Sequence, residues 1–252
     1  MTFWSDQKMK LSGQMSDMQI ESKSLNRILP VICYTPPDYT TYQNYPLLIA
    51  QDGRDYIQIG RLASTADKWI TGGVIRPVII VAIPYETPAS RWDLYYPEGS
   101  LYQAYLSALS EDVLPIVAST RSISEAPEDR TLIGDSLGGT ISLMTALNRP
   151  DLFDSVIMQS PYCGSRKMMQ QIRSATHLPS FIYHSTGRGE TAVKTTRGTT
   201  ENFLEPNREL HRILSSREPD HYIFVESGGI HTWRFWQPDI KRALIEKYGL
   251  KM

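Results

Sequence analysis

The sequence has little of several features that would mark a specialised class of protein. It contains only two cysteines, Cys33 and Cys163, which are too few for a disulfide scaffold. Its formal net charge is −1, so charge gives no indication of a nucleic-acid partner. Its longest apolar run, residues 78–83, is far shorter than a segment that could span a bilayer. We therefore expect a globular protein with neither a nucleic acid nor a membrane as its partner.

The N-terminus lacks the basic and apolar segments of a secretion signal. Cytoplasmic location is therefore our expectation, although a secreted form with its signal removed would look the same. The 252 residues and 41% hydrophobic content suit one domain over residues 1–252, with residues 1–13 as a loose extension. The sequence leaves the oligomeric state open, a homo-oligomer included.

Short apolar runs alternate with helical patterns along the chain. Unbroken apolar runs are typical of strands covered on both faces, whereas residues 14–33 alternate loosely, as in antiparallel edge strands. This order predicts an α/β fold: a mostly parallel central sheet, helices on both faces and antiparallel N-terminal edge strands. The expected parallel strands are residues 46–50, 78–83, 132–133, 155–158, 181–183 and 222–225, and the clearest helices are residues 100–117, 206–215 and 238–248.

Residues 131–140 are the most informative segment. They read as a short strand, a G-x-S-x-G turn around Ser136 and the start of a helix, the context in which a serine stands clear of a sheet edge. Gly134 and Gly138 lack a Cβ and let the strand and the helix approach closely. An apolar segment follows and ends at a helix stop signal, residues 148–150. Ser136 is therefore the candidate nucleophile.

A serine hydroxyl needs a base, and the base needs an orienting partner. His231 follows the last expected strand on a glycine-containing turn, where the chain order serine, acid, histidine places the base. His184 ends a strand at the same edge and is the main rival, with lining of the pocket as its other interpretation. The remaining histidines are expected at the wrong sheet end or inside a helix: His177, His221 and His211.

The acid should lie between the serine and the histidine in the chain. Glu190 fits, because it follows a strand and a glycine turn. A solvated glutamate paired with Arg188 is the alternative interpretation of the same residue. Other carboxylates in this part of the chain are Glu201, Asp220 and Glu226.

An oxyanion hole needs two preorganised N–H donors. The amide of Leu137, directly after the nucleophile, is the first candidate. The second should come from the loop after strand 46–50, where Gly53 and Arg54 are the candidates. The choice between these two stays open, and a simple Asp-Gly turn is the alternative interpretation of this loop.

Several segments together resemble the esterase D-like family of α/β-hydrolases, in particular its enterochelin esterase branch. The matching segments are residues 34–39, 45–53, 89–94, 134–139, 150–153, 159–161 and 228–236, within a span of about 28–245. The resemblance implies an α/β-hydrolase that cleaves esters through an acyl-serine intermediate, and it supports Ser136, Glu190 and His231. No metal or organic cofactor is needed for that chemistry. One departure is a polar stretch, residues 191–204, before the family's helix-opening asparagine, here Asn207.

Arginine and aromatic side chains gather near the expected strand ends. They would suit an anionic, aromatic ligand, such as the catecholate siderophore trilactones on which the enterochelin esterase branch acts. A simple acyl or acetyl ester is the alternative, since loop arginines are usually solvated and Trp233 and Trp236 could pack a helix. The expected substrate-binding residues are Arg91, Trp92, Arg188, Trp233 and Tyr162.

Other functions on the same fold are also open. The family includes mycolyltransferases, so acyl transfer is one alternative, and a thioesterase or S-formylglutathione hydrolase is another. A non-catalytic binding module is the alternative from a different class, although an intact serine, histidine and acid argue against it.

Overall fold

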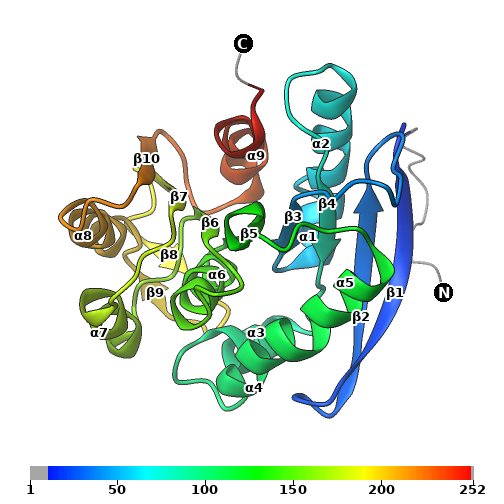
Figure 1. The fold of residues 1–252 in the computed structure, drawn as a ribbon. Coiled ribbons are helices and arrows are strands. Elements are labelled where there is room, and N and C mark those ends of the chain that lie inside the picture. Colours follow the sequence, from blue (N-terminus) through cyan, green and yellow to red (C-terminus); the bar gives the residue numbers. More distant parts are fainter. Residues whose placement is uncertain (1–10, 251–252) are drawn as a thin grey trace.

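The computed structural model describes residues 11–250. An eight-stranded sheet has the order β1-β2-β4-β3-β5-β6-β7-β10 (Figure 1). Its N-terminal strands β1 and β2 run antiparallel to each other, β2 is antiparallel to β4, and all later pairs are parallel. The predicted fold class is therefore confirmed. The strands are β1 (Gln14–Ser22), β2 (Arg27–Thr35), β3 (Leu47–Ala50), β4 (Ile79–Ala82), β5 (Arg130–Asp135), β6 (Ser155–Gln159), β7 (Phe181–Gly187) and β10 (His221–Ser227).

Helices cover both faces of this sheet (Figure 1). One face carries α1 (Gly53–Gln58), α2 (Leu62–Thr71) and α9 (Trp233–Tyr248). The other carries α3 (Pro88–Tyr95), α4 (Tyr102–Ser107), α5 (Leu114–Thr120), α6 (Leu137–Asn148), α7 (Arg166–Ser174) and α8 (Leu204–Ser215).

The strand β3 shows why both faces need cover. Its side chains alternate between two apolar layers, because successive residues of a strand point to opposite faces. Leu47 and Ile49 join the core beneath α6, whereas Leu48 and Ala50 join the core beneath α9. All four residues are fully buried, as expected for a central strand of a parallel sheet.

Three helices differ from their expected bounds. The segment predicted as one helix over 100–117 has a π-helical turn, Ala108–Val113, between α4 and α5. Pro115 follows this turn and has no N–H to continue a regular ladder. Helix α9 begins at Trp233 rather than at Pro238, the start of the predicted helix, and Pro238 lies inside it. Helix α8 begins at Leu204, two residues before its expected start.

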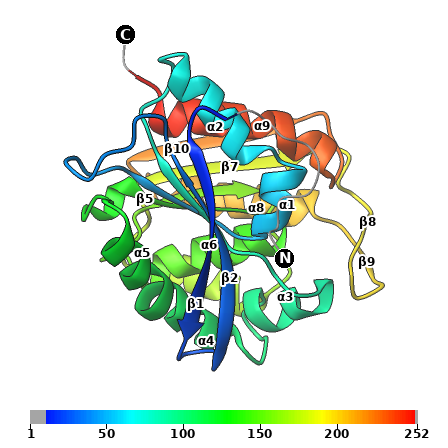
Figure 2. The same ribbon diagram turned by 90° about the vertical axis from the view of Figure 1, so that its right-hand side faces the viewer.

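The predicted polar insertion contains a small hairpin. Strands β8 (Val193–Lys194) and β9 (Thr200–Glu201) pair with each other in a sheet of their own. The hairpin projects between β7 and α8, beside α3 (Figure 2). It therefore lies at the carboxyl edge of the parallel strands, where ligands bind in sheets of this kind.

The expected N-terminal extension, residues 1–13, lies largely outside the described residues. Its last two residues bind the fold, since the amides of Ser12 and Gly13 donate to Asp67 at 3.0 and 2.7 Å. Within residues 11–250, no helix is long and apolar enough to cross a membrane.

The approach of β5 to α6 gives a first prediction. A Cβ on Gly134 would lie 2.1 Å from the backbone carbon of Gly138, so Gly134→Ala must push the strand and the helix apart. We expect a loss of about 3 kcal/mol or more in the free energy of unfolding, measured by chemical denaturation. Gly228→Ala is the control, because a Cβ there meets nothing within 4 Å. Equal stability of the two variants would contradict this account.

Candidate active site

Ser136 lies on the turn between β5 and α6 in a strained backbone conformation. Its φ of 52° and ψ of −123° are rare for a residue with a side chain. Neighbouring backbone holds this geometry. The Ser136 amide donates to the backbone carbonyl of Gln159 at 2.9 Å, and the Ser136 carbonyl accepts from the Tyr162 amide at 3.0 Å. The turn therefore fixes Ser136 at the end of β5, where its side chain lines a cavity.

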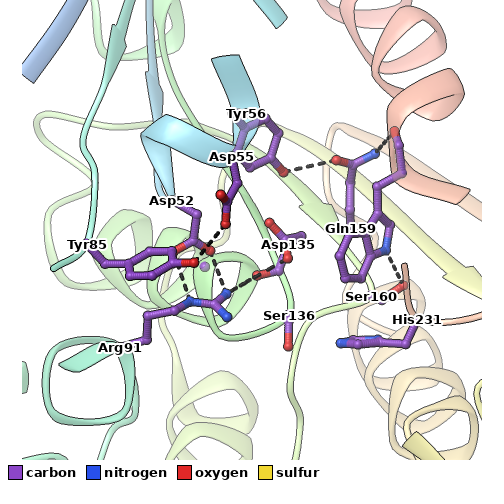
Figure 3. Close-up of polar contacts among 12 residues, drawn as sticks. Asp52, Asp55, Tyr56, Tyr85, Arg91, Asp135, Ser136, Gln159, Ser160 and His231 are labelled. Carbon is purple, nitrogen blue, oxygen red and sulfur yellow. Dashed lines mark hydrogen bonds and ion pairs between the residues drawn. The ribbon is translucent and has the colours of Figure 1, made fainter. Parts of the chain in front are cut away.

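His231 and Glu190 are in direct contact beside this serine. His231 Nδ1 lies 2.9 Å from Glu190 Oε2, so Nε2 is the ring nitrogen left for another partner. Figure 3 shows the imidazole directed toward Ser136. The side chains of His231 and Ser136 line the same cavity. This arrangement brings together the three residues that the sequence predicts for a catalytic triad.

Glu190 is fully buried and held by further donors. Its Oε1 accepts from the Ser160 hydroxyl at 2.6 Å and from the Gly187 amide at 3.0 Å. Trp236 Nε1 in turn donates to Ser160 Oγ at 3.0 Å. These hydrogen bonds hold the Glu190 carboxyl group in a position that solvent does not reach. Sequence patterns did not indicate this role for Ser160, because its position depends on a positive φ of 47°. The contact of Trp236 depends in turn on where Ser160 lies.

The rival residues lie elsewhere. His184 is buried inside β7, with Nε2 2.8 Å from Asn207 Oδ1 and Nδ1 3.1 Å from the Tyr222 hydroxyl. Burial lowers the pKa of His184 to about 4, so it is neutral at pH 7. Glu226 forms two hydrogen bonds with Arg208, each of 2.7 Å. His184 and Glu226 are therefore bound to partners other than Ser136.

The oxyanion-hole candidates differ in their surroundings. Leu137 is the first residue of α6 and lines the cavity, so its amide belongs to a helix N-terminus at the site. The Gly53 amide instead donates to the Ile83 carbonyl at 2.8 Å, and the structure therefore does not support Gly53 as a donor. Arg54, the next residue in the first turn of α1, stays a prediction for the second donor.

Arg91 is engaged by carboxylates rather than presented to a ligand. From α3, its Nε and Nη2 donate to the two oxygens of Asp52 at 2.9 and 2.5 Å (Figure 3). Its Nη2 also lies 3.8 Å from Asp135 Oδ2. Arg91 also lines the cavity with Ser136, so substrate binding by Arg91 stays a prediction beside this structural role, which the sequence did not indicate.

The buried pair of carboxylates changes the ionisation of this cluster. Burial raises the pKa of Asp135 to about 8, helped by the charge of Asp52 and opposed by Arg91. Conversely, the two carboxylates raise the pKa of Arg91. The carboxyl group with this raised pKa lies directly before the candidate nucleophile in the chain.

The other expected substrate-binding residues divide into two groups. Trp92, Tyr162 and Trp233 line the cavity with Ser136. Arg188 is exposed on the turn after β7 and is not part of that lining, so the structure does not support its expected role. Its position directly before a glycine turn places it outside, since the turn directs Glu190 inward and Arg188 outward.

The cavity over Ser136 is small, about 160 Å³. Its walls combine Ser136, His231, aromatic rings and the hairpin. Among residues 11–250, no cluster of side chains is arranged to hold a metal ion. The lining includes Ser136, His231, Trp92, Tyr162, Phe203, Trp233, Trp236, Arg91, Asp55, Asp135, Leu137 and residues 193–196.

The strand order, the strained serine turn and the site at the carboxyl edge define an α/β-hydrolase. The chain belongs to the family described as "Putative esterase", which matches residues 22–246. It is 38% identical to the uncharacterized protein YjcH of Bacillus subtilis, over 92% of this chain and 97% of that protein.

More distant similarities lie among siderophore esterases. The iron(III) salmochelin esterase of Escherichia coli is 23% identical over 85% of this chain, which spans about half of that protein's length (52%). The enterobactin esterase of Shigella flexneri superposes with a TM-score of 0.78 at 19% identity, over 93% of this chain and 58% of that one. At this identity the structural likeness concerns the fold alone.

The raised pKa of Asp135 predicts a pH dependence of stability. Between about pH 4 and about pH 8 the unfolded chain releases a proton that the folded protein keeps, so the free energy of unfolding should fall as pH rises. In Asp135→Asn this contribution is absent. We expect the stability difference between the two proteins to change by more than about 1 kcal/mol between pH 5 and 8 in urea titrations.

The exposed Asp220 provides the control for this measurement. Asp220→Asn should keep the wild-type pH dependence. Parallel stability curves for the wild type and Asp135→Asn would show that Asp135 is ionised throughout.

Proposed function

We propose that this protein is a serine carboxylic-ester hydrolase with Ser136 as nucleophile, His231 as base and Glu190 as acid. The contact between His231 Nδ1 and the buried Glu190, 2.9 Å long, carries the proposal. It leaves the opposite ring nitrogen directed toward Ser136, whose strained turn exposes the hydroxyl to the same cavity (Figure 3). Membership of an esterase family supports this reaction class.

In the first step, Ser136 Oγ attacks the ester carbonyl while His231 Nε2 accepts the hydroxyl proton. Glu190 keeps the imidazole in the required tautomer and stabilises the imidazolium. The Leu137 amide, together with one from the Arg54 turn, stabilises the tetrahedral oxyanion. The imidazolium then protonates the leaving alcohol, and water attacks the acyl-serine with His231 again as base.

The cavity favours a small ester as the substrate. Sites for drug-sized ligands usually exceed about 300 Å³, roughly twice the space over Ser136. The guanidinium of Arg91 is paired with both oxygens of the Asp52 carboxylate, so it offers little charge to an anionic substrate. A short acyl ester that leaves these groups undisturbed fits the site best.

A siderophore trilactone is the second candidate. It is supported by the similarity to the salmochelin and enterobactin esterases and by Lys194, an exposed cation in the cavity lining. A ferric catecholate trilactone is far larger than the cavity, so it would need a more open site. Parallel assays with the trilactone and a short ester decide between the two substrates.

Removal of the nucleophile tests the reaction. Ser136→Ala should lower kcat for p-nitrophenyl acetate by about 10³-fold or more, because the acyl-serine cannot form. A fluorophosphonate probe should label the wild type but not this variant. Full activity in the variant would contradict the mechanism, and an unlabelled, inactive wild type would favour a binding module.

Acyl transfer would appear as faster release of nitrophenol when an alcohol is added as an acyl acceptor.

Removal of the acid charge tests the third member. Glu190→Gln should lower kcat by about 10²- to 10⁴-fold, because the amide no longer stabilises the imidazolium, while KM changes little. Glu226→Gln is the matched control, since that carboxylate pairs with Arg208. A larger loss in Glu226→Gln than in Glu190→Gln would show that the acid is misassigned.

A further inference from the structure

A short hairpin, residues 191–203, separates the buried Glu190 from α8. Its strands β8 and β9 pair with each other and form a sheet separate from the central one. Its base is closed, because the amides of Phe203 and Leu204 donate to the Glu190 carbonyl at 2.9 and 3.2 Å. The hairpin therefore leaves and rejoins the fold beside the candidate acid.

The far end of the hairpin is attached to α3. Trp92 Nε1 donates to Thr196 Oγ1 at 2.7 Å. The Arg197 guanidinium lies 4.0 Å from the centroid of the Trp92 ring and 5.2 Å from that of Tyr96. A planar cation over an indole face is a favourable contact. We call these contacts of Thr196 and Arg197 with α3 the clasp; they hold the hairpin beside α3 (Figure 2).

The clasp closes one side of the cavity over Ser136. Residues 193–196 of the hairpin line the cavity together with Trp92 and Tyr162. The enclosed space of about 160 Å³ resembles the cavity of about 150 Å³ that binds benzene in another protein. A group the size of a single ring fits there while the hairpin is clasped.

Little else holds the outer part of the hairpin. Val193 is its buried apolar residue, whereas Lys194 and residues 196–200 are exposed. Segments with few buried apolar contacts open at a low cost in free energy. Besides the clasp, the side chain of Glu201 in β9 forms a hydrogen bond with Tyr162. The contacts to α3, together with this one, therefore decide how often this wall of the cavity is closed.

We propose that the clasp limits the size of the ester that reaches Ser136, with Arg197 as a specificity-determining residue. This inference rests on the proposed esterase function. Arg197 acts through Trp92 and the hairpin, because it stacks on the ring that forms the opposite wall. Short acyl esters enter the clasped cavity, whereas long acyl chains react only when the clasp opens.

A chain-length series tests this size limit. We would measure kcat/KM for p-nitrophenyl acetate, butyrate and decanoate with the wild type and Arg197→Ala. The ratio of kcat/KM for decanoate to that for acetate should rise about tenfold or more in the variant, because the closed wall no longer excludes the long acyl chain. Arg197→Lys keeps the charge but loses the planar group, so it should give an intermediate ratio. The control Arg212→Ala, at an exposed position on α8, should keep the wild-type ratio.

Hydrogen exchange measures the opening directly. Amides of residues 193–201 should exchange faster in Arg197→Ala than in the wild type, while those of β5 stay unchanged. Equal exchange, or an equal decanoate-to-acetate ratio in two proteins that both hydrolyse acetate, would overturn the size limit and leave the esterase function intact. Absence of hydrolysis of every ester by the wild type would overturn the esterase function, and the size limit with it.

Discussion

A single guanidinium, that of Arg91, links the parts of the fold on which the site depends. It binds Asp52 on the turn after β3 and lies beside Asp135, the last residue of β5. Both carboxylates are almost completely buried, and two buried negative charges without a partner would be strongly destabilising. The Arg91 cation offsets part of that cost through its two hydrogen bonds to Asp52. As a result, α3, the turn that leads into Arg54 and the strand that ends directly before Ser136 keep one relative position.

The base and the acid depend on a second set of constraints, at the ends of β6 and β7. Ser136 and Ser160 both have positive φ, a conformation that persists only where surrounding contacts hold it. The strands share those contacts: the Ser136 amide binds Gln159, and the Ser160 amide binds the Ser185 carbonyl at 2.7 Å. Ser160 then presents its hydroxyl to Glu190, and Glu190 orients His231. Two strained serines, each directly after one of two adjacent strands, thus place the nucleophile and, through Glu190, the base.

Features carried by local sequence patterns could be predicted, and those that depend on distant contacts could not. The parallel strands follow from unbroken apolar runs, and the Ser136 turn follows from its glycines. The sequence likewise indicated Glu190 and His231, which the structure brings into contact. Nothing in the loop around Arg91 indicated that two carboxylates from other segments would neutralise it. The start of α9 was mispredicted because Pro238 imitates a helix start although the helix runs through it.

Helix α3 connects the charged cluster to the wall of the cavity through two adjacent residues. Arg91 binds the buried carboxylates beneath the site, and Trp92 contacts both the hairpin and Tyr162 above it. Ring contacts continue from Tyr162 to Phe203 and from Phe203 to His231, with centroids 5.5 and 4.2 Å apart. Helix α3 is held by the buried ion pair of Arg91, and Phe203 is held because its amide donates to the Glu190 carbonyl. The exposed outer part of the hairpin is therefore the wall that can move with least disturbance to the triad. A change in cavity size and preserved geometry at Ser136 are therefore compatible in this fold.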